Sequence, residues 1–267
     1  MILLTVASLW MSILFVWAVV SSWLSDNEVD KVGLRGRALV LVTAHPDDEA
    51  MFFSPTLLEL GKSQYDNEIH LICLSNGDYD GLGTIRKSEV IRSGQMLGLD
   101  SVFVGDLHDD IKKWWEAKEI MQLVDKRIKE LHTNKKITLL TFDESGVSDH
   151  PNHKSIYSAV KEYVKRRKYE AWKLKSWSLG EKYSGTVLST WAIINNSKLL
   201  PANIGKDKSK TSDPDKVIIH SNINQWFVSM ACMTFAHLSQ MEWFRWGWLL
   251  LSRYMTCNEL VRITASG

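Results

Sequence analysis

The sequence predicts an α/β domain with a Rossmann-like, mostly parallel sheet and helices on both faces, preceded by one transmembrane helix. Two observations lead to this prediction. Short apolar runs typical of buried strands alternate with segments of helical periodicity, a pattern that favours right-handed βαβ units. In addition, the 23 residues from Ile2 to Leu24 carry no charge. The 267 residues, 45% hydrophobic and 24% charged, suit one globular domain plus this appendage.

The uncharged N-terminal segment is long enough to cross a membrane. At about 1.5 Å per residue it would measure roughly 34 Å, against a hydrocarbon core of about 30 Å. It lacks the basic start and the A-x-A-like site of a cleaved signal peptide, so we expect a retained anchor. Lys31, Arg35 and Arg37 follow it, and the positive-inside rule then places the rest of the chain in the cytosol. We therefore expect an anchor (1–25), a polar linker (26–37) and a folded domain (38–267).

Four strand and helix pairs are predicted in the first 166 residues. The first strand begins at Leu39, and the other three cover 68–74, 101–104 and 136–142. The helices cover 50–61, 84–97, 114–131 and 152–166. Gly61 and Gly98 are typical helix stops. No G-x-G-x-x-G motif follows the first strand, which counts against a dinucleotide site.

Composition and charge argue against some classes of function. A net charge of +1 gives no electrostatic footprint for nucleic acid. The three cysteines have no CxxC spacing, which indicates a reducing environment and no structural zinc site.

The first predicted strand ends in an unusual polar cluster. His45, Pro46, Asp47, Asp48 and Glu49 follow one another directly. Proline has no N–H to donate, so it ends the strand, and the four ionisable side chains then lie at its carboxyl end. In open α/β sheets ligands bind at that edge. The alternative is an ordinary polar turn in which Asp48 caps the next helix.

A second polar cluster follows the fourth predicted strand and contains His150 and His153. Residues three apart lie on one face of a helix, so these two imidazoles could point inward together, as could His45 and Asp48. Imidazole and carboxylate are typical ligands of catalytic zinc, which keeps one position for water. A lone HxxH pair is more often structural, but two such clusters at strand ends of one sheet favour a hydrolytic metal site.

Four motifs in this order resemble those of the LmbE-like metal-dependent sugar de-N-acetylases. They are AHPDDEAMFF (44–53), TIRKSE (84–89), TFDESGVSDHPNH (141–153) and HLSQ (237–240). The chain looks most similar to the N-acetylglucosaminyl-phosphatidylinositol de-N-acetylases of glycosylphosphatidylinositol (GPI) anchor biosynthesis, including the hydrophobic N-terminus. The resemblance covers residues 38–255 and is weakest between 165 and 215.

The resemblance implies a role for each residue of the two polar clusters. His45, Asp48 and His153 would bind a divalent metal, with zinc as the first expectation. Iron, manganese or cobalt would also suit these ligands. Asp47 would be the general base that activates water. His150 would stabilise the oxyanion or protonate the leaving amine.

The resemblance also implies three substrate-binding residues, each with a structural alternative. Arg86 would contact the phosphate of the substrate, and is otherwise a surface helix arginine paired with Glu89 or with a Glu at a neighbouring turn. Asp109 would bind sugar hydroxyls or is an isolated acidic loop residue. His237 would line the pocket or orient a ligand, and is otherwise a core histidine. Glu49 has no implied role and is expected to support the site or cap a helix.

By the same resemblance, the protein would remove the N-acetyl group of N-acetylglucosaminyl-phosphatidylinositol in the second step of GPI synthesis. It would work at the cytosolic face of the endoplasmic reticulum membrane. Two other functions stay open: deacetylation of another N-acetyl sugar conjugate, and a non-catalytic scaffold of a glycolipid-processing complex. The anchor argues against a soluble conjugate, and the complete polar set argues against a scaffold.

The C-terminal part gives weaker signals. Residues 161–175 are basic with interleaved aromatics, typical of a solvated helix that leads into a strand, or of contact with anionic headgroups. We expect one or two strands within 177–194 and a polar loop over 201–215. Residues 225–251 are rich in tryptophan and phenylalanine and are expected to form helix, in the core, against a partner or partly in the membrane interface.

Overall fold

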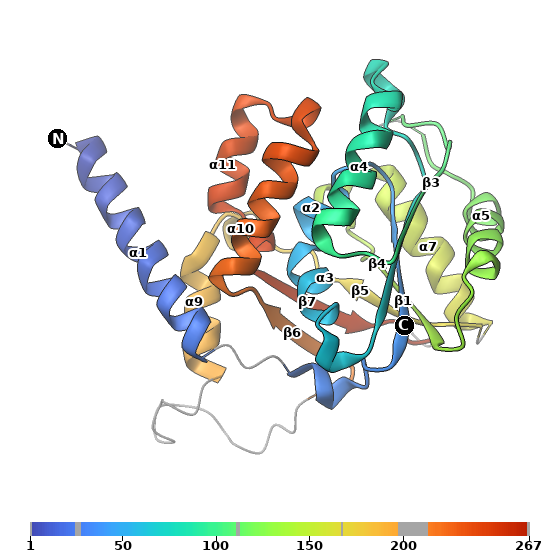
Figure 1. Cartoon of the computed structure of the whole chain (residues 1–267), viewed down its shortest axis with the longest axis horizontal. Coiled ribbons are helices and arrows are strands. Elements are labelled where there is room, and N and C mark those ends of the chain that lie inside the picture. The colour runs from blue at the N-terminus through green and yellow to red at the C-terminus, as the bar shows by residue number, and fades with distance from the viewer. Residues whose placement is uncertain (1, 25–27, 111–112, 167, 197–212, 266–267) are drawn as a thin grey trace.

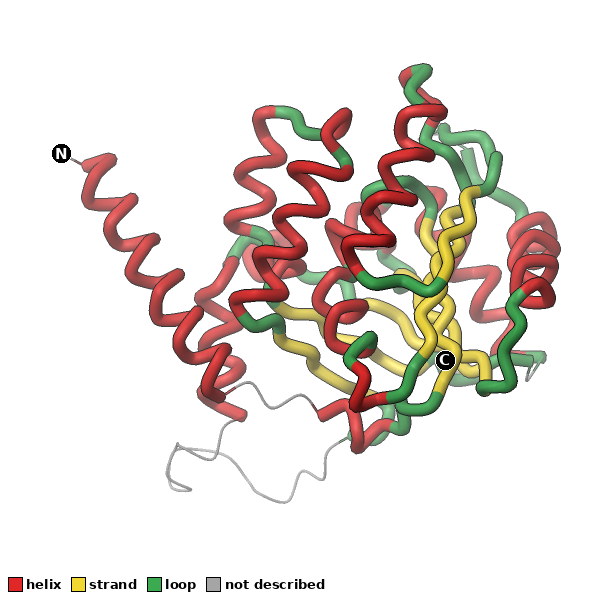
Figure 2. Tube along the Cα trace, in the orientation of Figure 1, coloured by secondary structure: helices red, strands yellow, loops and turns green. Residues whose placement is uncertain are grey.

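The computed structural model describes residues 2–24, 28–110, 113–166, 168–196 and 213–265, which form a seven-stranded sheet with helices on both faces (Figures 1 and 2). The strands are β1 (Arg37–Thr43), β2 (Glu68–Cys73), β3 (Ser101–Val104), β4 (Lys136–Phe142), β5 (Glu170–Leu174), β6 (Lys216–His220) and β7 (Cys257–Arg262). Their order is β3-β2-β1-β4-β5-β7-β6. The pairs from β3 to β5 are parallel, whereas β7 is antiparallel to both its neighbours. The predicted mostly parallel α/β sheet is therefore confirmed.

The helices enclose the sheet in two layers. They are α1 (Ile2–Leu24), α2 (Asp48–Phe52), α3 (Ser54–Leu60), α4 (Gly83–Leu97), α5 (Ala117–Glu130), α6 (Gly146–Asp149), α7 (Pro151–Lys165), α8 (Leu179–Lys182), α9 (Gly185–Asn196), α10 (Ile223–Ala231) and α11 (Trp243–Leu251). Short 3-10 turns and one π-helix, Cys232–Ala236, complete the described elements.

Strand β1 lies in the middle of the parallel part, and its burial explains its apolar sequence. Because side chains alternate along a strand, Leu39 and Leu41 enter one core cluster and Val40 and Val42 the other. The first cluster also takes in α3, α4 and α10, and the second takes in α5 and α7. With both faces covered, the polar loop at the end of β1 emerges at the carboxyl edge of the sheet.

Some predicted elements need correction. The helix expected over 50–61 is two helices, α2 and α3, with Pro55 in the first turn of the second, where its missing N–H costs little. Helix α5 begins at Ala117 rather than at Trp114. Most of the predicted polar loop at 201–215 lies outside the described residues.

The strands predicted within 177–194 are wrong, because α8 and α9 occupy that segment. A helix begins there because Ser178 donates from its backbone N–H and its hydroxyl to the Glu181 carboxylate. The β-branched residues that follow favour strands, but packing of α9 against α1 outweighs that preference. The sheet is instead completed by β5, β6 and β7.

The apolar N-terminal segment is one helix, α1, long and hydrophobic enough to cross a membrane. Its C-terminal half packs on the domain: Trp17 is fully buried and meets Trp226 of α10 edge to face at 6.2 Å. The N-terminal half and the outer side of the C-terminal half are largely exposed, with Leu4 at 76% and Phe15 at 70%. Figure 1 shows the N-terminal turns projecting beyond the domain.

Candidate metal centre and active site

A cavity of about 710 Å³ opens at the carboxyl edge of the parallel strands. Its floor is formed by the loop after β1 and the start of α7, and its walls by α4, the loop after β3, and α11. Seven of the eight predicted site residues line it: His45, Asp47, Asp48, Arg86, Asp109, His150 and His153. The two clusters that lie about 100 positions apart in sequence therefore meet because β1 and β4 are neighbours in the sheet.

The turn after β1 holds Asp47 in a strained conformation. Its φ of 115° is in the left-handed region that non-glycine residues rarely adopt. The backbone N–H of Asp47 donates to the Glu49 carboxylate at 3.2 Å, and its carbonyl accepts from Ala50 and Met51 at the start of α2. The turn therefore fixes the Asp47 side chain toward the cavity.

Asp48 is the centre of the donor cluster. One of its oxygens accepts the backbone N–H groups of Ala44 and His45, and the other lies 3.3 Å from His153 Nε2. Burial would raise the pKa of the Asp48 carboxyl, but the His153 and His45 imidazoles outweigh burial and hold that pKa well below its usual range. Asp48 is therefore a buried carboxylate.

The two nitrogens of His153 have different surroundings. Nδ1 lies 3.0 Å from the Gly146 carbonyl, which can only accept, so Nδ1 carries the proton. In the neutral form of the ring, Nε2 directs its lone pair at the Asp48 carboxylate, and this atom is buried without a well-aligned hydrogen-bond partner among the described residues. Two electron-rich atoms facing each other in a buried site fit a cation between them, and imidazole with carboxylate suits zinc.

His45 is oriented in a similar way. Its Nε2 lies 3.1 Å from Asp109 Oδ1 and 3.1 Å from the Asn152 amide nitrogen, while Nδ1 faces Asp48 at 3.8 Å. Burial opposes charge on this ring, but the hydrogen bond with Asp109 and the nearby carboxylates prevail and raise the pKa of His45. The same contacts lower the pKa of Asp109 against the effect of burial. Asp109 thus bonds a candidate ligand, a contact that the sequence did not predict.

His150 completes a group of three imidazoles with His45 and His153. Ligand atoms of these three rings lie within 4.8 Å of one another, so they could also hold a metal. Burial and the two neighbouring imidazoles lower the pKa of His150 to about 4. Its Nδ1 accepts the Asn152 backbone N–H, which leaves the proton of the neutral ring on Nε2. A ring nitrogen that carries a proton can donate a hydrogen bond but has no free lone pair for a metal, so Nε2 of His150 suits a hydrogen-bond donor better than a metal ligand.

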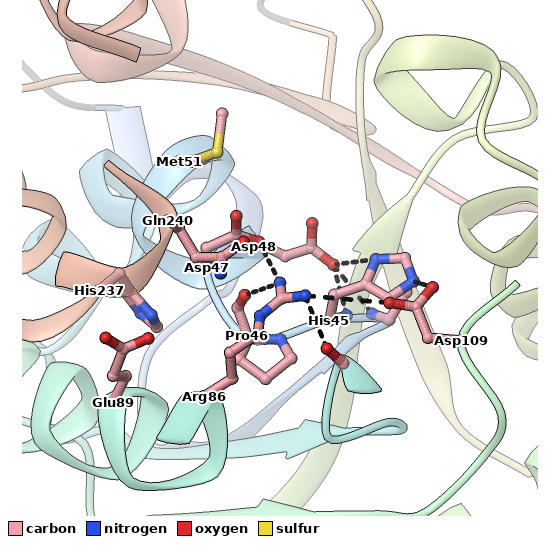
Figure 3. A network of polar contacts seen from close by, with 12 residues as sticks. His45, Pro46, Asp47, Asp48, Met51, Arg86, Glu89, Asp109, His237 and Gln240 are labelled. Atoms are coloured by element: carbon pink, nitrogen blue, oxygen red, sulfur yellow. Dashed lines mark hydrogen bonds and ion pairs between the residues drawn. The ribbon is translucent and has the colours of Figure 1, made fainter. Parts of the chain in front are cut away.

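Two arginines flank Asp47. An Arg86 nitrogen lies 3.7 Å from Asp47 Oδ1 (Figure 3). An Arg245 nitrogen lies 3.1 Å from Oδ2. Arg86 is largely buried and donates to the carbonyls of Gly77 and Pro46 at 3.0 and 2.7 Å. These bonds connect the loops that contain Gly77 and Pro46, and the side chain also lines the cavity. Arg86 is therefore not a surface arginine, which was the structural alternative. The prediction that it contacts substrate stays a prediction.

His237 does not line the cavity. Its ring has no exposed surface and lies 2.5 Å from the Glu49 carboxylate, which accepts also from the Ser93 hydroxyl at 2.5 Å. Burial lowers the pKa of His237, but the charge of Glu49 outweighs it and raises that pKa. The core alternative therefore describes its position. The predicted place at the cavity wall is wrong, because His237 is fully buried and bonds Glu49 instead.

The other residues of the HLSQ motif link it to α4. Ser239 donates from its backbone N–H and its hydroxyl to the Glu89 carboxylate, at 2.8 and 2.6 Å. Gln240 reaches the cavity wall. The motifs TIRKSE and HLSQ therefore contact each other through Glu89 and Ser239, and Glu89 lies near Arg86 (Figure 3).

Sequence reasoning missed several polar cavity residues, among them Tyr79, Asp80, Lys182, Tyr183 and Arg245. Burial lowers the pKa of the Lys182 ammonium. Arg245 had a signal, since it is a single cation within the aromatic run WFRWGW. Its contact with Asp47 depends on how α11 packs.

Comparison with known proteins agrees with this geometry. A family profile described as PIG-L, GlcNAc-PI de-N-acetylase, matches residues 40–164. A probable N-acetylglucosaminyl-phosphatidylinositol de-N-acetylase of Schizosaccharomyces pombe is 31% identical over 96% of this chain and 98% of its own length. The Bos taurus N-acetylglucosaminyl-phosphatidylinositol de-N-acetylase is 32% identical over 96% of this chain and 95% of its own.

Solved structures share the fold. An A40926 pseudoaglycone deacetylase has a TM-score of 0.57 at 12% identity, covering 87% of this chain and 99% of its own. The N,N'-diacetylchitobiose deacetylase of Pyrococcus horikoshii has a TM-score of 0.50 at 17% identity, covering 80% of this chain and 75% of its own. From these relatives and the motifs at its cavity, the chain belongs to the N-acetylglucosaminyl-phosphatidylinositol de-N-acetylase family.

Proposed function

We propose that this protein hydrolyses the acetamide of N-acetylglucosaminyl-phosphatidylinositol to give acetate and glucosaminyl-phosphatidylinositol, in the second step of GPI synthesis. The observation that carries the proposal is the donor cluster of His45, Asp48 and His153 with the separate carboxylate of Asp47 in the same cavity. That set combines cation ligands with a proton acceptor, which amide hydrolysis needs. The printed names of the relatives supply the substrate.

We assign the metal ligands as His45, Asp48 and His153, with zinc as the first candidate. His153 Nε2 and the Asp48 carboxylate already face one another, and His45 is held against both by Asp109. When bound, the metal would polarise the acetamide carbonyl and make a water molecule more acidic. His150 is left out of the ligand set because its cavity-facing nitrogen carries the proton.

Asp47 and His150 then divide the work of hydrolysis. Asp47 accepts a proton from water as the water oxygen attacks the acetamide carbon. The Nε2–H of His150 donates a hydrogen bond to the oxyanion that forms. Collapse breaks the C–N bond, and the proton taken by Asp47 goes to the leaving sugar nitrogen. The products are a free amine and acetic acid, which releases its own proton to water to give acetate. Neutral His150 fits the role of a donor to the oxyanion, since its pKa of about 4 leaves it uncharged near pH 7.

We further propose that α1 anchors the protein in the endoplasmic reticulum membrane with residues 38–267 in the cytosol. Support comes from its length and apolar surface and from the basic residues that follow it. An anchored enzyme would meet a lipid-linked substrate in the plane of the same bilayer.

The test uses the purified full chain in lipid nanodiscs with three substrates: the inositol glycolipid, free N-acetylglucosamine and a soluble N-acetyl sugar conjugate. We expect acetate release from the glycolipid, loss of activity with a chelator and recovery with zinc. Asp47→Asn should remove activity and leave the bound metal in place. Preference for a soluble conjugate would point to the other deacetylase function, and a metal-loaded but inactive chain would point to the scaffold.

Metal content tests the ligand assignment separately from activity. Asp48→Asn should lose the metal, as measured by elemental analysis after dialysis, whereas His150→Ala should keep it. The opposite result would replace Asp48 by His150 in the ligand set.

A further inference from the structure

Most of the exposed apolar side chains lie on one side of the protein. Apart from Trp114, the large hydrophobic residues that are exposed within the described part of the chain lie on α1, in 79–91, in 179–191 and in 227–251. None of them lies on α5, on α7 or on the strands. Figure 1 shows α1, α9, α10 and α11 together on one side and α5 and α7 on the other.

Helix α11 has two different faces. Trp243, Trp246 and Leu250 are spaced by three and four residues, so they share one face, and they are 83, 50 and 36% exposed. Trp248 and Leu249 are buried on the inner face. A tryptophan exposed to this extent is costly in water unless something covers it.

The exposed face of α11 continues into the mouth of the cavity. Phe244 and Leu251 are 53 and 41% exposed and also line the cavity, as does Tyr183 at 45%. The π-helix and the 3-10 turn that precede α11 add Phe235 and Leu238, at 70 and 65%. On the side of α11 the cavity mouth is thus apolar, whereas the exposed Asp80 lines it elsewhere and the floor is polar.

We propose that the surface formed by Phe235, Leu238, Trp243, Trp246 and Leu250, here called the aromatic rim, docks on the bilayer surface. It gives the protein a second membrane contact besides α1 and places the cavity mouth against the lipid headgroups. A glycolipid can then present its sugar to Asp47 while its acyl chains stay in the bilayer. The proposal rests on the proposed function for the identity of the substrate, but the contact itself does not.

Three features favour a bilayer over a protein partner. The exposed surface of α1, which has the length and composition of a membrane span, lies on the same side of the molecule. Tryptophan is the residue typical of the membrane interface. The rim also borders the opening through which the substrate has to enter, so a protein bound there would close it.

The first test measures the contact directly. A fluorophore is attached to Trp243→Cys in the full chain in nanodiscs, with Lys129→Cys on the exposed polar face of α5 as the matched control. The native cysteines are buried, which limits labelling to the introduced site. We expect blue-shifted emission and quenching by spin-labelled lipid at position 243 but not at 129. Equal, water-like emission at both positions would overturn the proposal and leave the rim open for a protein.

The second test separates docking from chemistry. Trp243→Ser/Trp246→Ser should lower turnover of the bilayer-embedded glycolipid by about tenfold or more. Turnover of a water-soluble analogue without acyl chains should stay within about twofold, and Trp114→Ser should change neither rate. Equal loss on both substrates would refute the docking role. If the wild-type chain released no acetate from either substrate, the proposed function would fail, and the fluorophore result would still decide the contact.

Discussion

The buried pair of Glu49 and His237 allows the sharpest quantitative prediction. The Glu49 carboxylate has no exposed surface and accepts three hydrogen bonds, from His237, Ser93 and the backbone of Asp47. Removing one member of a buried ion pair typically costs about 3–5 kcal/mol, because the other charge is left without a partner. We therefore expect Glu49→Ala to lose about this much unfolding free energy and His237→Ala a similar amount. Because a domain has about 5–15 kcal/mol in total, either loss should be easy to measure.

The isosteric change Glu49→Gln should cost less, about 1.5–3 kcal/mol, since volume is kept and only charge-assisted bonding is lost. Its effect on activity should be larger than its effect on stability. The Asp47 N–H loses its carboxylate acceptor, and the strained φ of 115° can relax, which moves the proposed base. We expect kcat to fall by about 10- to 100-fold with the bound metal kept, because an ångström of misplacement has an effect of this order.

The assay is urea unfolding of the full chain in detergent, followed by tryptophan fluorescence, together with acetate release. Glu59 supplies a matched control: it is also a buried carboxylate with three partners, Lys62, Tyr65 and Gln225, but none of these partners lines the cavity, whereas Glu49 bonds the backbone of Asp47. Glu59→Gln should lower stability and leave kcat unchanged. The reasoning is refuted if Glu49→Ala unfolds at the wild-type urea concentration, or if Glu49→Gln and Glu59→Gln affect kcat equally.

Three other predictions concern different parts of the structure. His150→Ala should lower kcat by about 10²–10³-fold with metal content unchanged, and unchanged kcat would exclude it as the oxyanion donor. Arg245→Ala should lower kcat/KM by about 10- to 100-fold, since a charge-assisted bond to Asp47 is lost; a wild-type value would show that Arg86 alone orients the carboxylate. Burial alone would raise the pKa of Glu170, but bonds from Lys136 and Arg37 lower it to about 2. This stabilisation is present above a pH of about 4.5 and is lost as the pH falls toward about 2, so Glu170→Gln should cost about 1 kcal/mol at pH 7 and almost nothing at pH 2. A pH-independent difference in unfolding would contradict the ion pairs.

Local sequence patterns predicted the parallel half of the fold and the floor of the cavity. The four strand and helix pairs follow from periodicity, and the clusters at 45–49 and 150–153 stand at strand ends that topology brings together. The C-terminal part was harder, because its structure depends on distant partners. Helix α9 contains β-branched residues and is helical where it packs on α1. Arg245 contacts Asp47 across 198 positions of sequence, and no local pattern reveals such a contact.

The position of His237 shows a similar limit. The motif places His237 at the cavity wall, but in the structure its ring is fully buried and bonds Glu49. Sequence spacing gives the face on which a side chain lies, but not whether it contacts substrate or supports a residue that does. That distinction needs the packing of the π-helix Cys232–Ala236, which directly precedes His237.

The burial of Trp17 has a practical consequence for anyone who prepares this protein. A membrane anchor is commonly removed to obtain a soluble enzyme, on the assumption that it is only a tether. Here α1 covers part of α9 and α10, and Trp17 fills a fully buried position against Trp226. Cutting the chain after residue 25 would uncover that surface, so we expect the shortened protein to aggregate, and purification should keep α1 in detergent or nanodiscs.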